Sequence, residues 1–278
     1  MQRKITEKVQ GTWAVDGAGV KLVRVLGPNT IKTFDPILML DSFDSTNPAD
    51  YTAGFPTHPH RGIETISYVS SGKMKHSDSL GFSDTVESGE VQWMTAGSGI
   101  VHEELVPASD RLLGVQLWLN LPQKDKMTTP KYHAIKAEEI QEIPFEGGYV
   151  RLLAGNYENY QGFQSEHLPF DYYDIHLQPN QSLTVQLAEN RSVMAFTLLE
   201  DAEIAGEPVA EKTAVKLSEG TEITFSAGDK AAQILFMSSL ALKESVAWGG
   251  PIVMNTEAEL REAFAELRTG RFLKEKMQ

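Results

Sequence analysis

The sequence predicts an all-β protein with two successive sets of strands and one helix near the C-terminus. Short runs rich in β-branched and aliphatic residues recur along the chain, and turn residues such as Gly, Pro and Ser separate them. A more polar and irregular stretch near the middle divides these runs into two groups of similar length. Many short strands at such spacing indicate β-barrels or β-sandwiches.

The strands expected in the first half alternate apolar and polar residues or form short apolar runs. The run Val20–Leu26 alternates and stops at Gly27-Pro28, a pair typical of turns. The run 91–94 stops at Ala96-Gly97-Ser98-Gly99, which favours a tight turn into the next strand. In all, the strands expected in this half are 20–26, 65–69, 91–94 and 113–119.

The stretch 122–148 is expected to connect two domains, 1–135 and 136–278. It contains three prolines and the pair Gly147-Gly148, with a short helix expected over 136–140. Strands resume beyond it, at 172–177, 183–187, 193–198, 214–217, 221–225 and 232–237. The second half therefore resembles the first in architecture, although no strict short repeat is visible.

One helix is expected over 256–270. Thr256 and Glu259 have the spacing of a capping box, in which each side chain bonds the backbone N–H of the other residue. Gly270 is suited to end the helix. Apolar residues follow the cap at a spacing of four and three, which places Leu260, Phe264 and Leu267 on one stripe.

Composition restricts the possible partners. The 278 residues include 25 Lys and Arg against 38 Asp and Glu, a net charge of −13, which disfavours direct binding to nucleic acid or to an anionic membrane. No Cys is present, so disulfides, thiolate nucleophiles and iron–sulfur clusters are excluded. No apolar run approaches the ~20 residues of a membrane span, and the N-terminus has no apolar targeting segment. A cytoplasmic location is expected.

Two pairs of residues have the spacing of metal ligands on β-strands. His58 and His60 are two residues apart, and so are His102 and Glu104. On a strand, residues i and i+2 point to the same face, so each pair can direct both side chains into one barrel interior. Pro59 makes a helix unfavourable at the first pair.

Three imidazoles and one carboxylate suit Fe(II), Mn, Co, Ni, Cu or Zn, and are too rich in nitrogen for Ca or Mg. Four protein ligands on an ion that accepts five or six leave open positions for a substrate or dioxygen. His76 and His133 are expected at the surface or beside the ligands, without binding the ion.

These motifs resemble those of the cupins, and more narrowly those of the pirin family. His58-x-His60-x3-Glu64 is similar to the first cupin motif, and Gly97-x-Gly99-x2-His102 to the second, with Gly97 where Pro is usual. Longer segments that resemble pirins are 35–41, 55–65, 92–104, 114–121 and 250–256, so the resemblance covers most of the chain.

The resemblance implies two tandem cupin (jelly-roll) β-barrels with metal only in the first. The sequence agrees, since only His167 and His176 follow residue 133 and they form no His-x-His pair. Two carboxylates are candidates for the fourth ligand: Glu64 has the position of the ligand in ordinary cupins, and Glu104 that of the ligand in pirins. Glu104 is favoured because it is two residues from His102 and shares its strand face. Glu64 is then expected to lie beside the ligands.

The pirin resemblance implies a metal-dependent dioxygenase of the quercetin 2,3-dioxygenase type, with Fe(II) as the expected cofactor. Its substrates would be an aromatic polyphenol and O2, and its products a depside and CO, with Glu104 as the catalytic base. Pocket walls are expected from Phe43, Phe55, Met74 and Trp118. Two alternatives stay open: a different oxygenase or isomerase, and a non-catalytic metal sensor that acts through a protein partner.

Overall fold

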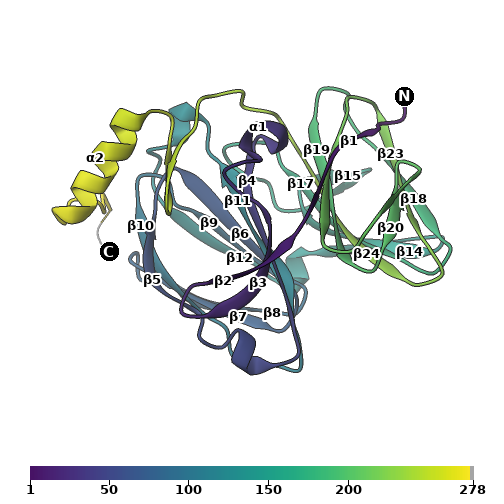
Figure 1. Cartoon of the computed structure of the whole chain (residues 1–278), viewed down its shortest axis with the longest axis horizontal. Helices are drawn as coiled ribbons and strands as arrows, with labels where there is room; N and C mark the ends of the chain where they lie inside the picture. The colour runs from purple at the N-terminus through teal and green to yellow at the C-terminus, as the bar shows by residue number, and fades with distance from the viewer. Residues whose placement is uncertain (276–278) are drawn as a thin grey trace. The chain divides into compact units, whose positions relative to one another are not determined.

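A computed structural model describes residues 1–275, which group into two compact units built from antiparallel β-sheet (Figure 1). The unit named here the first barrel comprises Trp13–Val23, Ile37–Lys136 and the segment from Leu242 onward. The second barrel comprises Met1–Thr12, Arg24–Pro36 and Ala137–Ala241.

This division differs from the two contiguous halves expected from the sequence. The N-terminal strand β1 (Ile5–Gln10) pairs with β22 (Thr213–Leu217), so it belongs to the second barrel. The C-terminal segment, helix included, belongs to the first barrel. Such pairings join segments that are distant in the sequence, and local patterns carry no sign of them.

The first barrel contains a seven-stranded sheet, in the order β12-β9-β6-β11-β4-β3-β2, and a four-stranded sheet, in the order β5-β10-β7-β8. The bounds of its strands are β2 (Thr12–Asp16), β3 (Val20–Leu26), β4 (Ile37–Ser45), β5 (Phe55–His60), β6 (Ile63–Ser71), β7 (Lys73–Asp78), β8 (Ser83–Glu87), β9 (Glu90–Thr95), β10 (Ile100–Leu105), β11 (Leu112–Asn120) and β12 (Lys131–Ile135).

The second barrel repeats this arrangement, with a seven-stranded sheet (β1-β22-β19-β24-β17-β14-β13) and a four-stranded sheet (β18-β23-β20-β21). Its further strands are β13 (Gln141–Phe145), β14 (Gly148–Ala154), β17 (Asp171–Leu177), β18 (Ser182–Gln186), β19 (Ser192–Leu199), β20 (Ala202–Ile204), β21 (Glu207–Val209), β23 (Glu222–Ala227) and β24 (Ala232–Ser239), with a small hairpin of β15 (Asn156–Tyr157) and β16 (Tyr160–Gln161). Two sheets per unit is the jelly-roll arrangement.

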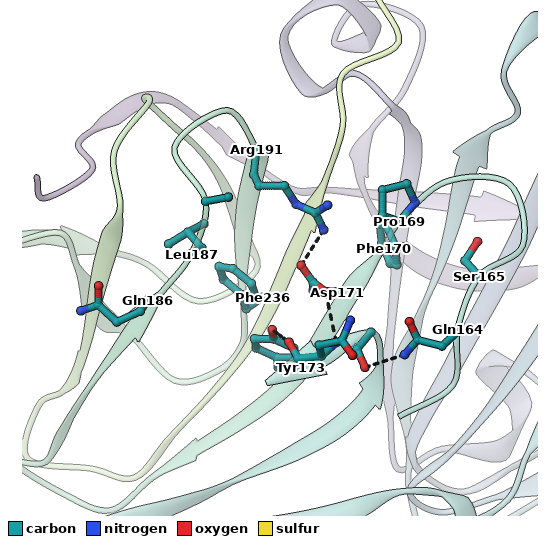
Figure 2. A pocket seen from close by; sticks show the side chains of 13 residues that line it. Gln164, Ser165, Pro169, Phe170, Asp171, Tyr173, Gln186, Leu187, Arg191 and Phe236 are labelled. Atoms are coloured by element: carbon teal, nitrogen blue, oxygen red, sulfur yellow. Dashed lines mark hydrogen bonds and ion pairs between the residues drawn. The ribbon is translucent and has the colours of Figure 1, made fainter. Parts of the chain in front are cut away.

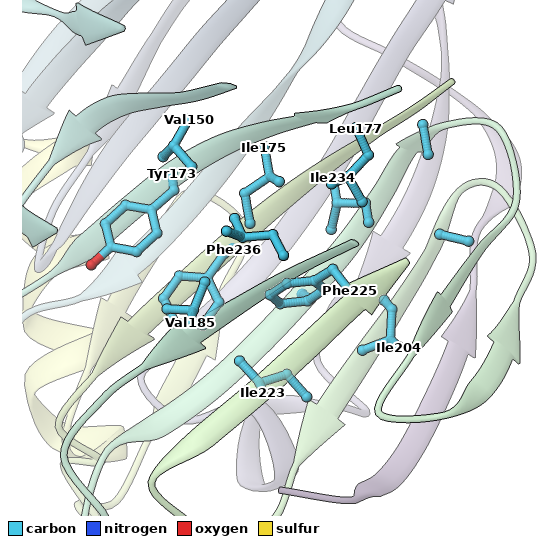
Figure 3. Close-up of a cluster of buried hydrophobic side chains, with 14 of the residues drawn as sticks. Val150, Tyr173, Ile175, Leu177, Val185, Ile204, Ile223, Phe225, Ile234 and Phe236 are labelled. Carbon is cyan, nitrogen blue, oxygen red and sulfur yellow. The ribbon is translucent and has the colours of Figure 1, made fainter. Parts of the chain in front are cut away.

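Apolar side chains fill the interior of the second barrel (Figure 3). Alternate residues of β17, namely Tyr173, Ile175 and Leu177, join this core, as strand periodicity requires. Phe225 and Phe236 meet there edge to face, with ring centroids 6.1 Å apart.

The C-terminal segment of the first barrel forms a hairpin of β25 (Ala247–Gly249) and β26 (Ile252–Met254), followed by α2 (Glu257–Arg268). The predicted helix is confirmed, and its capping box between Thr256 and Glu259 is present. Leu260 and Ala263 are its buried residues and pack with Ala247 and Ile252 of the hairpin.

Other short helices lie at connections. They are α1 (Ile31–Phe34) and the 3-10 turns η1 (Pro48–Asp50), η2 (Gln123–Asp125) and η3 (Ala137–Glu139). The helix expected over 136–140 is therefore only a single 3-10 turn, held between β12 and β13. No helix within residues 1–275 is long and apolar enough to cross a bilayer.

Candidate metal centre

The four-stranded sheet of the first barrel brings the two ligand pairs together. β10 lies between β5 and β7, and His102 on β10 is directly opposite His58 on β5. On its other side His102 faces Asp78 of β7. Since His58 and His60 are two residues apart on β5, both imidazoles reach the same face as His102.

Glycines permit the turns that lead into these strands. Gly54 has a φ of +64°, and a Cβ at this position would lie 2.7 Å from the carbonyl oxygen of Glu104. Gly99 has a φ of +136°, and a Cβ there would lie 2.9 Å from the carbonyl oxygen of Phe272. Any other residue would displace β5 or β10 where it carries the candidate ligands.

The three imidazoles converge through their Nε2 atoms. His58 Nε2 is 3.0 Å from His60 Nε2 and 3.0 Å from His102 Nε2. Two nitrogens bound at 2.0–2.1 Å to one ion, at a right angle, are about 2.9 Å apart. The observed separations therefore fit neighbouring positions around a single six-coordinate transition-metal ion.

The contacts of the outer nitrogen, Nδ1, in His58 and His60 determine that the inner nitrogen, Nε2, carries the lone pair. His58 Nδ1 is 2.8 Å from the carbonyl oxygen of Pro56, and His60 Nδ1 is 3.1 Å from that of Pro251. A carbonyl oxygen only accepts, so each Nδ1 carries the proton and each Nε2 carries a lone pair. Two lone pairs 3.0 Å apart repel each other unless a cation lies between them.

A chain of three side chains orients His102 in the same way. Asp78 Oδ2 is 2.7 Å from His76 Nε2, and His76 Nδ1 is 3.3 Å from His102 Nδ1. The carboxylate requires the proton on His76 Nε2, so His76 Nδ1 accepts and His102 Nδ1 donates. His102 Nε2 therefore also presents a lone pair, and the carboxylate–imidazole chain supports it as a ligand.

Burial keeps the imidazoles of His60 and His102 neutral. Burial, reinforced by the neighbouring His58, lowers the pKa of His60 to about 3 even though the Pro251 carbonyl opposes the shift. Burial and the adjacent histidines also lower the pKa of His102 well below its usual value. A proton on either ring is disfavoured at neutral pH, and neutral imidazole is the form that binds metal.

The Glu104 carboxylate is not part of this cluster. Within residues 1–275, His58, His60 and His102 form the group whose ligand atoms lie within 4.8 Å of one another, and Glu104 is outside it. Glu104 is buried, and Gln116 Nε2 lies 2.9 Å from both of its oxygens. That Glu104 is the fourth ligand stays a prediction.

Glu64 is buried on β6, in the other sheet. Its Oε1 accepts hydrogen bonds from Trp93 Nε1 at 3.1 Å and from Thr95 Oγ1 at 2.7 Å. These partners fix the orientation of the carboxylate within the seven-stranded sheet.

The four residues expected as pocket walls fall into two groups. Trp118 lies against the candidate ligands, with its ring centroid 5.0 Å from that of His60, and its buried Nε1–H has no acceptor among the described residues. Phe43, Phe55 and Met74 pack in an apolar cluster of the first barrel. Phe43 and Phe55 meet edge to face there, at 6.1 Å.

Sequence reasoning missed two contributors to the site and left the place of a third open. His76 was expected at the surface or beside the ligands; it is buried and contacts His102, so the second alternative is confirmed. Tyr132 stacks on His76 at 4.1 Å, and its buried hydroxyl has no partner among the described residues. Pro251 supplies the carbonyl that orients His60. The pair His76-x-Asp78 has the same i, i+2 spacing as the ligands and could have been noticed, whereas nothing local identifies Tyr132 or Pro251.

Comparison with known proteins agrees with this geometry. The profile of the Pirin family matches residues 19–119, and that of the Pirin C-terminal cupin domain matches residues 172–273. The predicted pair of cupin barrels is thereby confirmed.

Relatives align over nearly the whole chain. A Pseudomonas aeruginosa protein, provisionally named a quercetin 2,3-dioxygenase, is 36% identical over 96% of this chain and 97% of its own. Human Pirin is 32% identical over 97% of this chain and 93% of its own. The crystal structure of quercetin 2,3-dioxygenase from Acinetobacter baumannii superposes with a TM-score of 0.89, at 31% identity, over 98% of this chain and 99% of that one.

Proposed function

This chain belongs to the pirin family, and from that premise we propose that it is a metal-dependent dioxygenase that cleaves a flavonol such as quercetin. The reaction would consume one O2 per flavonol and yield a depside and CO, with both oxygen atoms of O2 in the products. One observation carries the proposal: the Nε2 atoms of His58, His60 and His102 converge, with His58 Nε2 3.0 Å from each of the other two, and the contacts of the Nδ1 atoms favour a lone pair on each Nε2.

Fe(II) is the metal we propose, and Mn, Co, Ni, Cu or Zn would fit the same nitrogen donors. When bound, the metal's charge lowers the pKa of the flavonol 3-hydroxyl and holds that oxygen in place. His58, His60 and His102 would hold the ion, and we propose Glu104 as an additional ligand on the same strand face as His102.

Glu104 is also the residue we propose as general base. It would accept the proton of the flavonol 3-hydroxyl on a carboxylate oxygen, and the amide of Gln116 keeps the carboxyl group oriented at 2.9 Å. Because the site is buried, the charge separated in this step is weakly screened by water, so the orientation of the carboxylate matters more than it would in solvent.

Two unsatisfied donors beside the imidazoles suit a polyphenol. The Trp118 indole N–H and the Tyr132 hydroxyl are buried without acceptors among the described residues. Burial and nearby carboxylates raise the pKa of Tyr132, so its hydroxyl remains a donor. We propose that the two groups bind oxygen atoms of the substrate, and that Phe43, Phe55 and Met74 support the apolar wall.

The remaining proposals concern partners and location. The net charge of −13 disfavours direct binding to nucleic acid, and we propose a small aromatic polyphenol and O2 as the partners. We propose that the chain works in the cytoplasm.

The test is anaerobic reconstitution with Fe(II), followed by quercetin and then air. We expect the flavonol absorption to disappear with near-stoichiometric release of CO. Glu104→Gln should weaken metal retention and lower turnover by about 10²–10⁴-fold, since it removes a general base. Glu103→Gln is the matched control, because Glu103 is on the same strand and faces the other way.

Two outcomes would contradict the proposal. Unchanged turnover in Glu104→Gln would exclude Glu104 as the base. Metal binding with no turnover of any flavonol, together with a protein partner retained in a pull-down, would instead support a metal sensor.

A further inference from the structure

The second barrel contains a cavity that the dioxygenase proposal does not use (Figure 2). Its volume is about 310 Å³, which is enough for a molecule of one or two rings. Every residue that lines it belongs to the second barrel. Side-chain amides stand at the exposed rim, where the lining residues include Asn156, Gln164 and Gln186.

The inner surface of this cavity is aromatic. Tyr173 and Phe236 are buried and stack with ring centroids 4.9 Å apart and an interplanar angle of 20°. The Tyr173 hydroxyl donates to the backbone carbonyl of Asn156, so its polar end is satisfied within the protein. Phe170 and Leu187 extend the apolar lining, which favours a flat apolar ligand.

One cation points into the cavity and is held rigidly (Figure 2). Arg191 Nε donates to Ser238 Oγ at 2.9 Å, and Arg191 Nη2 donates to the Ser238 carbonyl at 3.0 Å and to Asp171 Oδ2 at 2.5 Å. Arg191 Nη1 makes no hydrogen bond to a described residue. A guanidinium fixed on one side, with a nitrogen left over on the other, is a preorganised donor for an anionic group.

Asp171 positions this guanidinium and has no oxygen without a donor. Its Oδ2 accepts from Arg191, and its Oδ1 accepts from the backbone N–H of Asn156 at 3.2 Å. The wall is tightly built here, because a Cβ on Gly155, whose φ is +80°, would lie 2.4 Å from Asp171 Oδ1.

We propose that this cavity binds a small aromatic carboxylic acid. The carboxylate would accept hydrogen bonds from Arg191 Nη1, and the ring would lie against Tyr173 and Phe236. This site is separate from the three histidines and needs no metal.

Benzoate and its neutral analogue benzamide are the probes, titrated calorimetrically into the full-length protein with a chelator present. We expect benzoate to bind and benzamide to bind at least about tenfold more weakly, because it loses the charge-assisted hydrogen bonds. Absence of benzoate binding, or equal affinity for the two probes, would overturn the proposal. So would benzoate binding that is seen only when the chelator is left out, since the carboxylate would then be on a metal ion.

Two pairs of variants locate the site. Ala188→Trp fills the exposed rim while leaving the backbone carbonyl that Arg3 contacts, so benzoate binding should be lost. Ala210→Trp, the same change at an exposed alanine of this barrel outside the cavity, should leave benzoate binding intact.

The second pair tests the guanidinium. Arg191→Gln should weaken benzoate binding about tenfold or more, and Arg151→Gln, which removes a cation paired with Glu142, should not. Full benzoate affinity in Ala188→Trp would contradict the proposed location.

Discussion

The two barrels share one architecture and differ in what their inward-facing strand positions carry. Each pairs a seven-stranded sheet with a four-stranded sheet. In the first barrel, the four-stranded sheet directs imidazoles together, from His58 and His60 on β5 and His102 on β10. In the second, the corresponding sheet contributes aliphatic and aromatic side chains to the core, among them Val185 on β18 and Phe225 on β23.

The difference shows that one architecture can present either a cluster of nitrogen donors or an apolar core, depending on a few side chains. A buried imidazole is costly unless its nitrogens have partners. The first barrel provides a partner for each outer nitrogen, through Pro56, Pro251 and His76. The second barrel instead buries apolar surface, which stabilises the fold without a cofactor.

The largest effect should come from removing one ligand. His60→Ala should abolish metal retention, because two imidazoles cannot hold the ion as three do. His176→Ala, the matched change on β17 of the second barrel, should leave metal content unchanged. The metal content of each variant is measured after gel filtration. Equal loss in the two variants would remove the functional distinction between the barrels.

A core truncation in the second barrel should lower stability and leave metal content unchanged. Phe225→Ala should lower the free energy of unfolding by about 3–5 kcal/mol, since the side chain is fully buried in a packed core. The metal content of the folded protein should not change. Denaturant unfolding and metal analysis together check this, and a folded variant that has lost its metal would contradict it.

The chain Asp78–His76–His102 should matter less than a ligand. Asp78→Asn or His76→Phe should weaken metal affinity about 10–100-fold, because His102 loses the partner that fixes its tautomer. Competition with a chromophoric chelator gives the affinity, and Glu103→Gln is the control on the neighbouring strand. An unchanged affinity in both variants would show that His102 needs no such support.

The last prediction concerns the pH dependence of stability. The pKa of His60 is lowered to about 3 by burial, against about 6.5 in the unfolded chain. Between these values the unfolded state binds more protons, so the metal-free protein should lose stability as pH falls from 6.5 toward 3, by up to about 1.4 kcal/mol per pH unit for this residue. Metal-free His60→Gln should show a shallower slope, and identical slopes would contradict the assignment.

Local patterns predicted much of this molecule. Strand periodicity placed His58 beside His60 in space because a repeat of two is a property of each strand alone. The capping box at Thr256 likewise depends on only four residues, and the helix begins there as expected.

Non-local pairings could not be predicted in this way. The contact of His76 with His102 depends on the register of β7 against β10, and that register has no signal in either strand alone. The same holds for β1, which joins the second barrel through β22, and for Pro251, which reaches His60 from the far end of the chain.

The central claim is that one transition-metal ion binds between His58, His60 and His102. Anomalous X-ray scattering from crystals of the Fe(II)-reconstituted protein tests it most directly. We expect one iron peak in the first barrel, within about 2.3 Å of all three Nε2 atoms. A map without a peak there, or with its main peak in the second barrel, would contradict the claim.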